Sequence, residues 1–315
     1  MKTIKILLAS PRGFCAGVKR AVDIVDMALK NSESPIYVRH EIVHNKRVVN
    51  DLKSKGAIFV KELEEVPRGE KVIFSAHGVS KKVKEDSKNY NQPSIDATCP
   101  LVSKVHQQIK LYEKQGYKIL LIGHKGHPEV DGIEGQVEQQ ILVIENEKQA
   151  RKLELKNIEK IAYVTQTTLS LDDTKEIIEI LKSKFPNIIG PDLNDICYAT
   201  QNRQIAVSKL ADLCQLVFVV GGENSSNTKR LAEIVKKKKV PVFRISGKED
   251  LNNKWLEGIT VLGITSGASS PEILIDEIID VLKINYDKVI IENLEGIEEN
   301  IKFRPLTKFS TTKSC

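Results

Sequence analysis

The sequence predicts an α/β protein made of three related units. Short apolar runs rich in Val and Ile alternate with amphipathic segments along nearly the whole chain, which is typical of parallel sheets covered by helices. Three cysteines, Cys15, Cys99 and Cys197, each stand at the start of a helical pattern. Polar loops recur at similar distances after each cysteine, which indicates an internal threefold repeat.

The apolar runs give the expected strands in chain order. The first run, IKILLA, leads through the loop PRGFCAG into the helical pattern GVKRAVDIVDMALK. Most later runs are also followed by a polar or glycine-containing turn and then a helix. The expected strands occupy residues 4–9, 35–40, 57–60, 71–76, 118–123, 141–145, 160–165, 187–190, 216–221, 240–245, 259–265 and 288–293.

The cysteine spacing sets the expected unit boundaries. The helical patterns CAGVKRAVDIV, CPLVSKVHQQI and CYATQNRQIAV begin at the three cysteines, at intervals of 84 and 98 residues. We therefore expect α/β units at residues 1–98, 99–196 and 197–285, followed by a C-terminal tail at 286–315.

A first polar loop follows each cysteine at a nearly constant offset. His44 lies 29 residues after the first cysteine, His127 lies 28 after the second, and Ser225 lies 28 after the third. A constant register of this kind is typical of a structural repeat.

A second polar loop recurs later in each unit with looser spacing. His77, Thr167 and Ser269 lie 62, 68 and 72 residues after their cysteines. In open α/β sheets, functional groups collect at the carboxyl ends of strands, which is where all six loops fall. Packed about a pseudo-threefold axis, the three units would bring the cysteines and loops to one central cavity.

Composition and charge exclude several classes of protein. Of 315 residues, 41% are hydrophobic and 29% are charged, which is ordinary for a globular protein. We expect no membrane association, since no segment approaches the ~20 apolar residues of a membrane span, and the chain start lacks the pattern of a signal peptide. Aromatic residues make up 5% and no basic stripe interleaves with them, so we expect no nucleic-acid binding. The expected compartment is the cytoplasm.

Thiols at helix starts suit metal binding. The unpaired N–H groups and the dipole of a helix N-terminus favour thiolate, the form that binds metal. Two soft-metal sites compete. Structural zinc normally uses paired ligands such as CxxC and four of them, whereas an iron-sulfur cluster held by three cysteines leaves one iron open to substrate. We interpret Cys214, inside an apolar stretch, as core packing, and the terminal Cys315 as an improbable ligand.

The polar loops suit an anionic substrate. Imidazoles of His44, His77 and His127 can donate hydrogen bonds to a phosphate or diphosphate, although each could also be a surface or core histidine. We interpret His40 and His106 as structural, and His124 as a supporting residue next to His127 in its loop.

Hydroxyl and carboxyl groups complete the expected site. Ser225, Ser226 and Ser269 follow strands and precede helices, where they would either bind an anion or serve as plain helix N-caps. Glu129, if buried, could hold and deliver a proton that Thr167 relays; otherwise it is a first-turn acid stabilising the helix dipole.

Nine motifs resemble those of one family in order. They are PRGFCAGV, YVRHEIVHN, FSAHGVS, DATCPLVSKVH, GHKGHPEV, TQTTLS, DICYATQNRQ, NSSN and GASSP. The sequence closely resembles the LytB/IspH family of 4-hydroxy-3-methylbut-2-enyl diphosphate reductases over almost its entire length. Only the tail after EENIKF carries no motif that matches.

The resemblance implies a reductive dehydroxylation at an iron-sulfur centre. It implies a trefoil of three α/β units around one four-iron, four-sulfur cluster with three cysteine ligands and one open iron. It also implies reduction of 4-hydroxy-3-methylbut-2-enyl diphosphate to isopentenyl and dimethylallyl diphosphate, the last step of the non-mevalonate isoprenoid pathway. Ferredoxin or flavodoxin would supply the electrons.

The resemblance also assigns residues to roles. By position in the motifs, the cluster ligands are Cys15, Cys99 and Cys197, and the proton-handling pair is Glu129 and Thr167. The diphosphate contacts are His44, His77, His127, Ser225, Ser226, Asn227 and Ser269. A non-redox hydro-lyase that uses the same cluster as a Lewis acid, and an oxygen-responsive iron-sulfur sensor, are the alternative functions.

Overall fold

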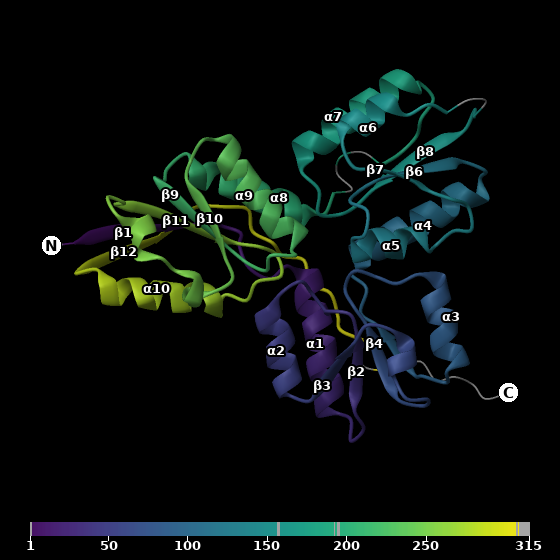
Figure 1. Cartoon of the computed structure of the whole chain (residues 1–315), viewed down its shortest axis with the longest axis horizontal. Helices are drawn as coiled ribbons and strands as arrows, with labels where there is room; N and C mark the ends of the chain where they lie inside the picture. Colours follow the sequence, from purple (N-terminus) through teal and green to yellow (C-terminus); the bar gives the residue numbers. More distant parts are fainter. Residues whose placement is uncertain (1, 156–157, 192, 194–195, 307, 309–315) are drawn as a thin grey trace. The chain divides into compact units, whose positions relative to one another are not determined.

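The computed structural model divides into two compact units, and the chain passes from one unit to the other several times. It describes residues 2–155, 158–191, 193, 196–306 and 308. Unit 1 comprises Met1–Ala16, His44–Val48 and Tyr198–Lys302, and unit 2 comprises Gly17–Val43, Val49–Cys197 and Phe303–Cys315. Figure 1 labels the helices and strands within them.

Unit 1 contains a five-stranded parallel sheet. Its strand order is β10-β9-β11-β1-β12. The strands are β1 (Thr3–Leu8), β9 (Leu216–Val220), β10 (Val242–Ile245), β11 (Val261–Ser266) and β12 (Lys288–Asn293). The helices of this unit are α8 (Tyr198–Ala211), α9 (Ser226–Lys237) and α10 (Ile273–Asn285), with short 3-10 turns at Lys248–Asp250 and Asn253–Leu256.

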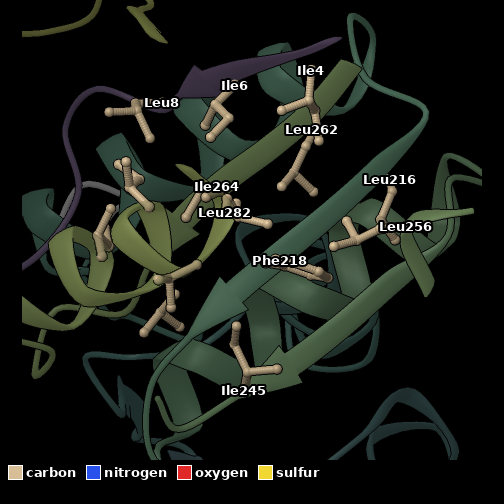
Figure 2. Close-up of a cluster of buried hydrophobic side chains, with 14 of the residues drawn as sticks. Ile4, Ile6, Leu8, Leu216, Phe218, Ile245, Leu256, Leu262, Ile264 and Leu282 are labelled. Atoms are coloured by element: carbon tan, nitrogen blue, oxygen red, sulfur yellow. The ribbon is translucent and has the colours of Figure 1, made fainter. Parts of the chain in front are cut away.

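The central strands of this sheet, β1, β9 and β11, are buried on both faces because helices cover each face, whereas the edge strand β12 is largely exposed. Side chains alternate along a strand, so Ile4, Ile6 and Leu8 of β1 point to the face that packs on α10, as Figure 2 shows. Leu7 points to the opposite face, which packs on α8 and α9. Burial on both sides explains why these strands read as nearly continuous apolar runs in the sequence.

Unit 2 contains two smaller parallel sheets. The first has the order β3-β2-β4-β5 and the second the order β7-β6-β8. The strands are β2 (Ile36–Arg39), β3 (Ala57–Val60), β4 (Lys71–Phe74), β5 (Ser94–Asp96), β6 (Lys118–Ile122), β7 (Leu142–Ile144) and β8 (Ile161–Thr165). The helices are α3 (Lys81–Asn89), α4 (Pro100–Lys114), α5 (Pro128–Glu134), α6 (Glu147–Lys152) and α7 (Leu171–Lys184), with a 3-10 turn at Leu63–Glu65. Helices α1 (Ala16–Lys30) and α2 (Lys46–Ser54) cross from unit 1 into unit 2.

The second sheet of unit 2 is also covered on both faces. On one face Ile119 and Leu121 pack against α4 and α5, and on the other Leu120 and Ile122 pack against α7. The α/β class with three parallel sheets is therefore confirmed.

Three local expectations differ from the structure. The run at 187–190 forms only an isolated bridge, between Ala162 and Ile189, and the short polar strand β5 was not expected. In addition, β1 pairs with β11 and β12 instead of with strands of the expected unit 1–98. Local apolar patterns locate a strand but carry no information about a partner more than 250 residues away. The boundaries of the three expected units stay predictions.

Candidate active site

The loop before α1 places Cys15 at a helix start, as its sequence pattern predicts. The Cys15 N–H donates to the Ala268 carbonyl at 3.2 Å, and the Gly13 N–H donates to Ser266 Oγ at 2.9 Å. Gly13 has a φ of 71°, in the left-handed region that favours glycine. The loop carrying Cys15 is thus held against the loop that follows β11.

His44 meets two of the polar loops within unit 1. Its Nδ1 lies 3.2 Å from Asn224 Nδ2, and its carbonyl accepts a hydrogen bond from Ser269 Oγ at 3.1 Å. A side chain at Gly222 would meet the same carbonyl, since a Cβ there would lie 2.7 Å from the His44 oxygen. The loops after β9 and β11 therefore close around the His44 backbone.

The N-terminus of α9 carries the serines and the asparagine predicted from the sequence. Ser225 is the N-cap, and its Oγ accepts a hydrogen bond from the Thr228 N–H at 3.3 Å. Asn227 is only 4% exposed, and neither its Oδ1 nor its Nδ2 has a hydrogen-bond partner in the described part of the chain. Buried polar groups are nearly always satisfied, so this amide is a candidate contact for a bound molecule.

A buried carboxyl group lies at the start of α5 in unit 2. Glu129 is 2% exposed, and its Oε1 accepts from the Thr167 N–H at 2.6 Å while its Oε2 accepts from Thr167 Oγ1 at 3.0 Å. Burial raises the pKa of Glu129 to about 7, against the lowering by the two Thr167 hydrogen bonds. Near neutral pH this group can therefore hold a proton and release it.

Two histidines lie at and beside the start of α5, the helix that carries Glu129. His127 is the N-cap of α5, where its Nδ1 accepts from the Glu129 N–H at 3.1 Å. The His77 ring lies edge-on to the His127 ring with centroids 5.8 Å apart, and His77 Nδ1 lies 3.3 Å from Ser75 Oγ. Both imidazoles and Glu129 thus belong to one group of titratable side chains.

Glycines on α5 and directly after it allow the helix to pack closely on the His77 loop. A Cβ at Gly132 would lie 3.2 Å from the backbone of Gly78, and a side chain at Gly135 would overlap Ser80. The Gln136 amide donates to the Val79 carbonyl at 2.7 Å. This close approach holds the loop after β4 against the helix that carries Glu129.

The other two cysteines also stand at helix starts. Cys99 is the N-cap of α4, and its N–H donates to the Ala76 carbonyl at 3.0 Å, one residue before His77. The Cys197 N–H donates to the Thr167 carbonyl at 3.3 Å, directly before α8 begins. Backbone hydrogen bonds thus tie each of these cysteines to a loop of the group described above.

The chemistry of the thiols distinguishes three cysteines from the fourth. All four described cysteines are half-buried, but Cys15, Cys99 and Cys197 stand at helix N-termini, whereas Cys214 packs against the core and burial raises the pKa of its thiol to about 12. A thiol with so high a pKa is protonated at neutral pH, which agrees with a role in core packing. Cys315 lies outside the described residues.

Within the described ranges, no three His, Cys, Asp or Glu side chains are grouped so as to hold a single metal ion. In a cubane cluster each thiolate binds a different iron, so its ligands do not converge on one point.

The remaining histidines occupy supporting positions. His106 is 5% exposed, and burial lowers its pKa to about 4, so it is neutral at physiological pH. Its ring lies against Gly78, beside His77. The His124 N–H donates to Gln166 Oε1 at 3.0 Å, and His40 has a left-handed φ of 61°.

Sequence reasoning did not find Asn224 or Arg203. Asn224 lies inside the loop GGENSSN, and Arg203 lies inside the motif DICYATQNRQ, so both were within motifs already noted. An asparagine or arginine in a loop or helix has no periodicity that marks it as functional.

No helix in the described part of the chain is long and apolar enough to cross a membrane.

The three parallel sheets, with polar and titratable groups at the carboxyl ends of their strands, define an α/β enzyme. The family model described as LytB protein matches residues 6–283. The chain belongs to the LytB family.

Curated relatives and solved structures agree with this family. A relative from Glaesserella parasuis serovar 5 (strain SH0165), named 4-hydroxy-3-methylbut-2-enyl diphosphate reductase, is 54% identical over 95% of this chain and 96% of its own length. One of the same name from Nitrosomonas europaea is 50% identical over 97% of each chain. The solved structure of the E-1-hydroxy-2-methyl-but-2-enyl-4-diphosphate reductase from Plasmodium falciparum matches with a TM-score of 0.91 and 40% identity, covering 98% of this chain and 96% of that one.

Proposed function

We propose that this protein is a 4-hydroxy-3-methylbut-2-enyl diphosphate reductase that forms isopentenyl and dimethylallyl diphosphate, the last step of the non-mevalonate isoprenoid pathway. Family membership and the names of relatives across 95% of the chain support the reaction. The observation that carries it is the buried Glu129, whose pKa of about 7 suits proton delivery at neutral pH.

The reaction replaces a C–O bond with a C–H bond. It consumes two electrons and two protons: one proton leaves with the hydroxyl group as water, and the other attaches to carbon. Glu129 is the proposed source of the first proton, and Thr167, hydrogen-bonded to both carboxyl oxygens, is the proposed relay. The Thr167 contacts also fix the carboxyl plane, so that the proton is presented in one direction.

The proposed cofactor is one four-iron, four-sulfur cluster with three thiolate ligands and one open iron. Cys15, Cys99 and Cys197 would hold it, because they are the half-buried thiols at helix N-termini. When bound, the cluster supplies single electrons and a Lewis-acidic iron for the substrate hydroxyl. The trefoil arrangement of the three α/β units around it stays a prediction.

The diphosphate would be bound by histidines, serines and one amide. Imidazole and hydroxyl donors at helix N-termini complement its negative charge. The unsatisfied amide of Asn227 favours this assignment, since a phosphate oxygen would accept from its Nδ2. The proposed contacts are His44, His77, His127, Ser225, Ser226, Asn227 and Ser269.

Anaerobic turnover tests the proposed function. Purified holoprotein is incubated with the allylic diphosphate, with and without a chemical reductant such as reduced viologen, and products are quantified together with reductant oxidised. We expect isopentenyl and dimethylallyl diphosphate with two electrons consumed for each product. Release of water without reductant consumption would instead establish the hydro-lyase, and bound iron with no turnover at all would favour the sensor.

Ferredoxin or flavodoxin as donor, and a cytoplasmic location, are further parts of the proposal.

A further inference from the structure

The C-terminal segment at residues 294–304 carries none of the predicted site residues, yet it contacts two buried arginines. In unit 1 it contributes Glu299, which is paired with Arg203. In unit 2 it contributes the Arg304 carbonyl, which accepts a hydrogen bond from Arg20 Nε at 3.1 Å. Each arginine also binds the backbone next to a proposed cluster ligand.

Arg203 lies on α8 and is only 1% exposed. Its Nε and Nη2 both donate to the Gly13 carbonyl, at 3.1 and 2.9 Å, two residues before Cys15. Its Nη1 also donates to the Ala199 carbonyl at 2.8 Å. The guanidinium therefore joins the Cys15 loop to the helix that begins directly after Cys197.

Glu299 compensates the charge of this buried guanidinium. Its carboxylate accepts from Nη1 and Nη2 of Arg203 at 3.0 to 3.2 Å, and from Asn202 Nδ2 at 3.1 Å. Glu299 is itself 13% exposed. A buried cation without its partner is strongly unfavourable, so removal of this carboxylate would draw Arg203 toward water and away from Gly13.

The segment is held in place before it reaches Glu299. The Leu294 N–H donates to the Leu8 carbonyl at 2.9 Å, which extends the pairing of β12 with β1. A side chain at Gly296 would overlap the Ser10 carbonyl, so the backbone passes directly against the loop that leads to Cys15.

Arg20 makes the corresponding contacts in unit 2. It lies on α1, is 7% exposed, and its Nη1 donates to the carbonyls of Ala97 and Thr98 at 3.3 and 3.1 Å. Thr98 directly precedes Cys99. Its guanidinium thus joins the Arg304 carbonyl of the C-terminal segment to the backbone directly before Cys99.

We propose that the segment 294–304 positions the cluster ligands. Glu299 and the Arg304 carbonyl bind the buried side chains of Arg203 and Arg20. These two arginines in turn hold the backbone next to Cys15 and Cys99 in place. The proposal rests on the proposed function, in which both cysteines bind the cluster. Glu299 and Arg203 are positioning residues, since they act through the ligand loop. They control how firmly the cluster is retained.

Glu299→Gln tests the unit 1 contact, with Glu298→Gln as the matched control. Glu298 is the adjacent, exposed glutamate, so both variants change the net charge equally. Hydrogen exchange of the Cys15 amide, followed by mass spectrometry, should be at least about 10-fold faster in Glu299→Gln, because a charge-assisted contact is lost. In anaerobically purified holoprotein, the cluster should also bleach in air at least about 10-fold faster, and its reduction potential should shift.

Gly296→Ala offers a second route to the same result without a change in charge. It should displace the segment and reproduce the faster exchange and bleaching. Equal exchange, bleaching and potential in Glu299→Gln, Gly296→Ala and Glu298→Gln, with unchanged far-UV circular dichroism, would overturn the proposal.

Truncation tests the unit 2 contact, because Arg20 binds a backbone carbonyl that no side-chain change removes. A chain ending at Lys302 lacks that carbonyl, whereas a control ending at Leu306 retains it. We expect faster exchange of the Cys99 amide only in the shorter chain, and equal exchange would refute this contact. If the parent protein binds no iron and sulfide, the proposed function fails, yet the exchange measurements on the same iron-free proteins still decide the positioning role.

Discussion

Glu129→Gln separates the catalytic role of the buried carboxyl group from its cost to stability. The amide is isosteric, and its oxygen can still accept from the Thr167 N–H. It cannot ionise or deliver a proton. We expect turnover to fall at least about 100-fold with the cluster intact, while the folded protein becomes more stable at neutral and alkaline pH.

The size of the stability gain follows from the pKa. A folded-state pKa of about 7, against the ordinary value of 4.5, makes the ionised form roughly 3 kcal/mol less favourable in the folded protein. Because the folded-state pKa of Glu129 is raised, its neutral form contributes stability that is fully present below pH 4.5. That stability is lost as the pH rises through about 7, and above pH 7 the loss is complete.

Urea unfolding of iron-free protein at pH 5 and pH 8 measures this difference. The stability advantage of Glu129→Gln over the parent should grow by roughly 2 to 3 kcal/mol between the two pH values, and the turnover of the parent should fall as the pH rises above about 7. A stability difference that does not change with pH would show that Glu129 titrates as an ordinary solvated acid. The proton-delivery role would then lose its physical basis.

Three further substitutions have expected outcomes. Thr167→Val removes one hydrogen bond from the ionised carboxylate, so the pKa of Glu129 should rise further, and the alkaline fall in turnover should move to higher pH with a rate about 10-fold lower. Asn227→Leu removes an unsatisfied buried amide, so urea unfolding should show about 1 kcal/mol more stability, while the KM for the diphosphate rises at least about 10-fold; an unchanged KM would remove this residue from the binding site. Gly78→Ala places a Cβ 2.7 Å from the His106 ring at a φ of 86°, and should cost about 1 to 3 kcal/mol in the same assay; a neutral result would mean that the loop after β4 is not tightly packed.

The sequence predicted most of the fold because the central strands of the sheets are buried on both faces. Strands such as Leu216–Val220 are continuously apolar, and a run of this kind is visible without any knowledge of its partners. The strand Ser94–Asp96 was missed because it is short and carries two polar residues. The pairing of β1 with β12 could not be predicted, since it joins the two ends of the chain.

Site residues differ in how far the sequence could reveal them. The helix-start cysteines and strand-end histidines follow from local patterns and a repeating offset. The pKa of Glu129 does not, because it depends on the burial that α5 and the Thr167 loop create together. Arg203 and Glu299 are 96 residues apart and bear no mutual pattern, so only the folded chain shows that they form a pair.

Iron and acid-labile sulfide counts in single cysteine variants test the central claim most directly. The parent and the variants Cys15→Ala, Cys99→Ala, Cys197→Ala and Cys214→Ala are purified under strict exclusion of oxygen. The account predicts about four irons and four sulfides for each chain in the parent and in Cys214→Ala, and loss of the intact cluster in each of the other three. Full cluster content in any one of those three, or its loss in Cys214→Ala, would contradict the assignment of the ligands.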